Sequence, residues 1–110
     1  MKEPLKQVSE IVAKANDLFY QKYTDVNTII GIIDKALRQQ GMNTDAVTID
    51  CIAQNKKLVL LMHDDRPDTI DLAFGDKEGN IFASSHLEMK RLSVEQMLAL
   101  LESNFVVKKH

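Results

Sequence analysis

The 110 residues of the chain match the size of one domain, and we expect residues 1–110 to fold as a single unit. Apolar residues make up 45 % and charged residues 27 %, which excludes a disordered chain. The net charge is only −2, with both signs interspersed along the chain. This balance excludes the basic surface of a nucleic-acid-binding protein. No stretch approaches the roughly 20 apolar residues of a membrane helix, so we expect no membrane partner.

The chain has a single cysteine, Cys51, which cannot form a disulfide within the chain. The N-terminal stretch MKEPLKQVSE lacks the apolar segment of a secretory signal. Together these features predict a reducing, cytoplasmic location.

The first half of the chain predicts an N-terminal helical hairpin. Apolar residues from Leu5 to Phe19 recur at helical spacing, and Pro4 suits a first helical turn, which predicts a helix over about residues 4–22. A second helix is expected to start after a cap at Thr24 or Asp25 and to end before Gly41. Its apolar set covers a wide arc of the helix and comprises Val26, Ile29, Ile30, Ile32, Ile33, Ala36 and Leu37.

From Ala46 the apolar residues alternate with a period of two, which is typical of strands. Strands are expected at residues 46–53, 58–63, about 70–74 and about 81–87, joined by a tight turn at Asn55-Lys56 and by a hairpin loop containing Gly79. These segments predict a four-stranded antiparallel meander.

A capping box, Ser93-Val94-Glu95-Gln96, predicts the start of a C-terminal helix. Apolar residues from Val94 to Phe105 then follow at helical spacing, and the tail Val106–His110 is expected to fray. The predicted fold is therefore an α+β domain with the order ααββββα. The hairpin Asp76–Ser85 resembles the D-x-x-G hairpin of several small signalling and regulatory folds, but these ten residues are too few to identify a family.

Two helices are wide enough to cover one face of a four-stranded sheet. The apolar run Leu58–Met62 and the wide arc of the second predicted helix indicate further apolar surface. Either the C-terminal helix covers the second face of the sheet or another chain does, and we expect a homodimer. With a turn at Asn55-Lys56, the second face carries the candidate interface, which comprises Ile52, Val59, Leu61 and His63.

Histidines give the sharpest chemical hypotheses. His63 precedes two aspartates and His86 forms H-x-E with Glu88, but in a meander the two histidines are about 9–10 Å apart, too far to share an ion. The same turn places His63 diagonal to Asp50, an arrangement that could act as an acid/base pair. No serine or cysteine nucleophile accompanies it, and a surface ion pair is the simpler interpretation. Cys51 alternates in phase with core residues and is expected to be buried and unreactive.

The sequence therefore predicts no catalytic residue, no metal site and no cofactor. The acidic turn around Asp64 lacks the spacing of a calcium loop, and the four glycines are too scattered to form a phosphate loop. We predict a non-catalytic protein–protein interaction or regulatory module that acts as a homodimer, with a possible further protein partner. The alternative is a small-molecule-binding or catalytic domain with a site around Asp50 and His63.

Overall fold

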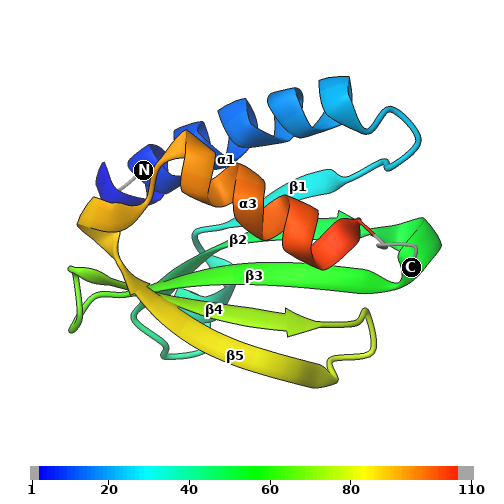
Figure 1. Ribbon diagram of the computed structural model, residues 1–110. Helices are drawn as coiled ribbons and strands as arrows, with labels where there is room; N and C mark the ends of the chain where they lie inside the picture. The colour runs from blue at the N-terminus through cyan, green and yellow to red at the C-terminus, as the bar shows by residue number, and fades with distance from the viewer. Residues whose placement is uncertain (1–2, 107–110) are drawn as a thin grey trace.

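The computed structural model describes residues 3–106 and has two layers, with helices on one side of an antiparallel sheet (Figure 1). The helices are α1 (Glu3–Lys22), the short α2 (Ala36–Gln39) and α3 (Val94–Phe105). The strands are β1 (Ile29–Ile33), β2 (Thr44–Cys51), β3 (Lys56–His63), β4 (Thr69–Gly75) and β5 (Ile81–Glu88). Short 3₁₀ turns occupy Ile52–Gln54 and Met89–Arg91. The α+β class and the α1 helix predicted from the sequence are confirmed.

The sheet is an antiparallel meander of five strands in the order β1-β2-β3-β4-β5. The prediction of four strands was wrong because the chain following α1 forms an edge strand instead of a second long helix. Ile30 lies opposite Ile49, and Ile32 lies opposite Val47. Only residues 36–39 of the expected second helix are helical.

The isoleucines explain this difference. Four β-branched side chains within five residues favour a strand, because branching at Cβ restricts the side chain in a helix and packs well on a pleated sheet. The apolar pattern alone fits either structure over so short a run. Pairing with β2 decides the conformation. It also brings Gly31 so close to β2 that an added Cβ would lie 2.7 Å from Thr48 Oγ1.

The β2–β3 register also differs from the prediction. Val59 lies opposite Thr48 instead of Ile52, a shift of four residues. The connection is a 3₁₀ turn over Ile52–Gln54 followed by Asn55 in the left-handed conformation, with φ 51°. Because the shift is even, each residue of β3 keeps the predicted face.

Both long helices pack on the same face of the sheet (Figure 1). The core residues that α1, the sheet and α3 bury between them include Val8, Val12, Phe19, Val47, Ile49, Leu58, Leu60, Ile70, Met97, Leu101 and Phe105. At one end of this layer Lys22 of α1 forms a 2.9 Å ion pair with Glu102 of α3. In the part of the chain described, no helix has both the length and the apolar composition to cross a bilayer.

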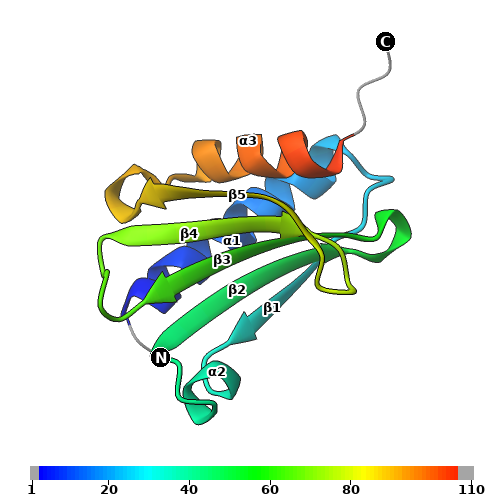
Figure 2. The same cartoon turned by 90° about the horizontal axis from the view of Figure 1, so that it is seen from below.

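The second face of the sheet is open. Figure 2 views it from below, with α1 and α3 behind the strands and α2 beside the end of β1. Of the two covers considered for this face, the C-terminal helix is therefore ruled out, since α3 lies on the other side.

Ser93 caps α3 as predicted, because its hydroxyl oxygen accepts a hydrogen bond of 3.1 Å from the backbone N–H of Gln96. The helix ends at Phe105. Fraying was expected over Val106–His110. Val106 instead packs against the core, and its N–H donates to the Glu102 carbonyl at 3.2 Å. The rest of that tail, residues 107–110, lies outside the described residues.

Replacing the cap tests this helix start. Ser93→Ala is expected to lower the free energy of unfolding by about 1 kcal/mol, because it removes the acceptor for an otherwise unpaired N–H. Ser93→Asp is the matched control, since its carboxylate also accepts this bond, and it should keep the wild-type stability. Urea denaturation followed by circular dichroism measures both. Equal losses in the two variants would contradict the cap.

Candidate interaction surface

The open face holds a shallow groove of about 320 Å³ across the middle strands. We call this groove, with the side chains that line it, the open-face groove. Its sheet residues come from all five strands and comprise Ile33, Ala46, Thr48, Lys57, Val59, Leu61, Ala73, Gly75 and Ile81. Most of them are apolar, although no long helix lies over them.

The floor of the groove is a row of small side chains that runs perpendicular to the strands. Register places Thr48 opposite Val59 and Val59 opposite Ala73, and these three residues line the groove. The same row continues outside the lining to Gly31 of β1 and Ser84 of β5. On β3 the larger Lys57 and Leu61 flank this row, whereas the flanking Ala46 of β2 and Gly75 of β4 are themselves small.

Leu37 of α2 lines one end of the groove, and the β4–β5 turn lines the other. This turn is internally braced. The Asp76 carboxylate accepts hydrogen bonds of 3.0 Å each from the backbone N–H groups of Glu78 and Asn80 and from Asn80 Nδ2. These bonds lower the pKa of Asp76, with the side-chain bond from Asn80 as the main cause. Gly79 supplies the left-handed residue, with φ 90°. The β4–β5 turn is therefore a rigid end of the open-face groove.

Two of the four predicted interface residues lie in the groove. Val59 and Leu61 are half-buried in the middle of β3. Ile52 does not lie on the face, because the shifted register leaves it in the 3₁₀ turn, where it is 68 % exposed. His63 is at the far end of β3, outside the groove lining.

The predicted pair of His63 and Asp50 is not formed. Asp50 lies opposite Lys57, with 3.7 Å between carboxylate and ammonium. His63 is six residues further along β3, about 20 Å away. The site proposed around these two residues therefore lacks the contact on which it was based.

His63 instead joins a polar network. Its Nδ1 lies 2.9 Å from Thr44 Oγ1, and its Nε2 lies 3.1 Å from the carboxylate of Asp71. This order of hydroxyl, imidazole and carboxylate resembles a nucleophile relay. Thr44 is only 3 % exposed, however, and Arg66 already binds the same carboxylate at 2.7 Å. We therefore interpret the network as structural.

The strand register also places His86, the second histidine considered as a metal ligand. His86 lies opposite Asp71 on neighbouring strands, so one aspartate stands between the two histidines. Among residues 3–106, no three His, Cys, Asp or Glu side chains are grouped so that they could hold a metal ion. Cys51 is buried and free of a disulfide, as expected.

The ends of β2 and β3 are held by an arginine between two aspartates. Arg38 of α2 donates bonds of 2.9 Å to each carboxylate oxygen of Asp45, and bonds of 2.8 and 2.9 Å to Asp64. Both carboxylates raise the pKa of Arg38. The cluster fastens α2 to the sheet and so fixes Leu37 at the end of the open-face groove.

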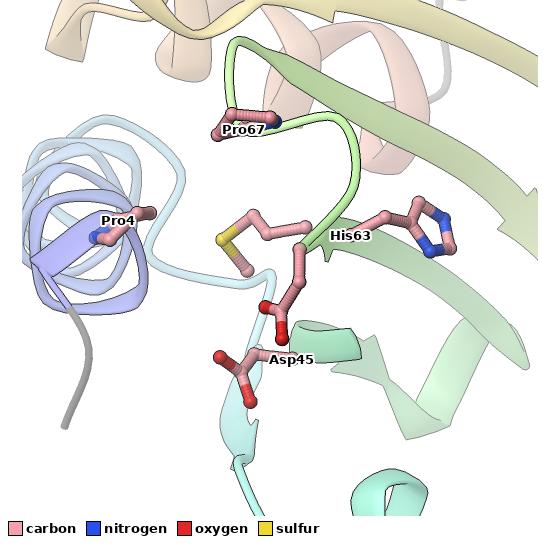
Figure 3. A pocket seen from close by; sticks show the side chains of 6 residues that line it. Pro4, Asp45, His63 and Pro67 are labelled. Carbon is pink, nitrogen blue, oxygen red and sulfur yellow. The ribbon is translucent and has the colours of Figure 1, made fainter. Parts of the chain in front are cut away.

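A second hollow of about 240 Å³ adjoins this cluster on the helix side of the sheet. Pro4, Asp45 and Pro67 border it, and the imidazole of His63 turns away from Pro4 and Asp45 (Figure 3). Because Arg38 occupies the carboxylate of Asp45, this hollow offers no unpaired acid at that residue.

Comparison of the chain with protein-family models, with curated proteins and with solved structures finds no match in any of the three. The site is therefore interpreted from its own geometry.

Several groove residues were missed by the sequence reasoning, namely Ile33, Leu37, Ala46 and Ala73. Ile33 and Leu37 were assigned to a helix. Ala46 and Ala73 do alternate with core residues of β2 and β4, and this period places them on the second face. Their small size, which forms the groove, becomes meaningful only once the strand order is known.

Breaking the Arg38 cluster should destabilise the domain. Arg38→Met is expected to cost about 2–3 kcal/mol, because it leaves the buried Asp45 carboxylate without its counter-ion. Adding Asp45→Asn should recover part of the loss. The control Arg66→Met, at a more exposed pair, should cost less than about 1 kcal/mol. Similar losses for the two arginine variants in urea denaturation would contradict this role.

Proposed function

We propose that the protein is a non-catalytic protein–protein interaction module, and that its open-face groove holds an amphipathic helix of a partner protein. The observation that carries the proposal is the apolar middle of this face, which no long helix of the described chain covers. Covering a large side chain such as Leu61 gains about 1.5–3 kcal/mol when burial is complete.

A helix fits this face better than an extended segment. An extended peptide lying across the middle of a sheet finds no free strand edge, so its main-chain N–H and C=O groups would lose water without gaining partners. A helix satisfies these groups internally. The short side chains of Thr48 and Ala73, on either side of Val59, also leave room for a helix over the middle strands.

Charge at the groove favours one kind of helix. Lys57 and Lys77 both line it near the β4–β5 turn, beside Asp76, whose carboxylate accepts hydrogen bonds from within the turn. Asp71 lies directly opposite Leu61 on β4, toward the other end. A partner helix with acidic residues near the lysines and an apolar stripe over Val59 and Leu61 would match this distribution.

The alternative of a catalytic domain has less support. It rested on an Asp50–His63 pair, and those residues are now separated along the sheet. The cytoplasmic location remains part of the proposal, and the unpaired, buried Cys51 is consistent with a reducing compartment.

A displayed library of amphipathic helical peptides provides the probe. Peptides selected on the wild-type protein are expected to bind Leu61→Asp at least about tenfold more weakly, since the charge would be desolvated against an apolar helix face. Fluorescence anisotropy measures the affinity. The control Leu18→Asp changes an exposed leucine of α1, on the other layer, and should bind as wild type does.

A second variant separates loss of binding from loss of folding. Ala73→Leu fills the groove without adding charge and should also weaken binding, while circular dichroism stays that of the wild type. Selected peptides that bind Leu61→Asp and Ala73→Leu as tightly as wild type would overturn the proposed function.

A further inference from the structure

The edge strand β1 is open for pairing. It lies at one side of the sheet, and in the region from residue 3 to residue 106 its only strand partner is β2. The strand contains no charge and no proline. Ile29 is 56 % exposed and Ile32 is 44 % exposed. An apolar edge without protection is a template for pairing with another chain.

The opposite edge is protected in ways that β1 is not. Strand β5 carries the polar side chains Ser84, Ser85, His86 and Glu88 in its second half. Its first half exposes Ile81 and Phe82, but there an irregularity at Phe74 and Gly75 shifts the register against β4. Polar side chains and bulges are common devices against edge pairing. The two edges therefore differ in their readiness to accept a strand.

The sequence of β1 identifies the partner. Ile29-Ile30-Gly31-Ile32-Ile33 reads the same in both directions, so the strand is complementary to itself in the antiparallel sense. We propose that two copies of the chain pair through β1 about a two-fold axis at Gly31, which joins two five-stranded sheets into one of ten strands. Ile29 then lies opposite Ile33 of the second copy, and Ile30 lies opposite Ile32. An isologous contact requires this self-complementarity.

Charges beside the strand allow this register. The first charged residue after β1 is Asp34, which the two-fold axis places beside Thr28 of the second copy. The two Asp34 side chains are then separated by six strand positions, about 20 Å. Like charges do not oppose each other at the seam.

The flank of α1 adds to the contact. Thr28, just before β1, is hydrogen-bonded to Asn16 of α1, so this flank of the helix faces the edge. Tyr20 is one helical turn further on the same flank and is 51 % exposed. Pairing of β1 brings the Tyr20 flanks of the two copies toward one another above the seam, so the interface includes side chains as well as main chain.

The open-face groove is a poorer site for a homodimer. It is hollow along the row of small side chains, and two hollow faces cannot fill each other about a two-fold axis. Pairing through β1 goes beyond the proposed function, because the groove remains free for a partner in the dimer.

Sedimentation velocity over a range of concentrations tests the pairing. The wild-type protein is expected to associate to a dimer, and Ile32→Lys should raise the dissociation constant about tenfold or more, since it places a charge on the seam. The control Phe82→Lys changes a residue of β5 that is 70 % exposed and should dimerise as wild type does. Circular dichroism confirms that both variants fold.

Other outcomes overturn the inference. A wild-type protein that stays monomeric at about 1 mM would contradict it, as would dissociation by Phe82→Lys or Leu61→Asp with none by Ile32→Lys. Peptide binding by Leu61→Asp is measured separately and tests only the open-face groove. The proposed β1 pairing and the proposed groove function can therefore fail independently.

A cysteine trap tests the register directly. In a Cys51→Ala background, mixed Ile29→Cys and Ile33→Cys chains should form an intermolecular disulfide under mild oxidation, since these positions face each other across the seam. Either variant alone should not, because its two cysteines would be about 13 Å apart. Equal cross-linking in the single variants would contradict a two-fold axis at Gly31.

Discussion

The packing of α1 and α3 on the same face of the sheet is the constraint on which the other features depend. It buries Leu58 and Leu60 of β3 completely, and it leaves Val59 and Leu61 of the same strand on the opposite side. A strand with apolar residues on both faces needs cover on both. In the described chain, α1 and α3 cover one face of β3. On the other face only the short α2 contributes, at the end of the groove.

Local signals in the sequence predicted the parts of the fold that local physics determines. The helical spacing from Leu5 to Phe19 gave α1, alternation from Ala46 gave the meander, and Ser93 marked the start of α3. These elements could be predicted because a cap, a turn or an amphipathic period acts within a few residues. The faces of β3 were also correct, since an even register shift preserves them.

The parts of the fold that the sequence did not predict, namely β1 and the β2–β3 connection, depend on long-range contacts. Strand β1 exists because residues 29–33 pair with β2, and the same isoleucines fit a helix when considered alone. The β2–β3 connection is tied to the end of α3, where Gln54 donates to the Phe105 carbonyl at 2.7 Å and Lys56 donates to the Asn104 carbonyl at 3.1 Å. Neither contact leaves a signal in the local sequence. The sequence therefore predicted two residues of the candidate surface, Val59 and Leu61. It did not predict the groove, because the shape of the groove depends on the strand order and register.

The central claim is that β3 has one face covered by helices and one face open. The most direct measurement is the relaxation of methyl groups by a soluble gadolinium chelate, recorded by NMR at a dilution where the chain is monomeric. The methyl groups of Val59 and Leu61 should relax strongly, while those of Leu58 and Leu60 should be protected. Equal protection of all four residues in the isolated chain would contradict the open face.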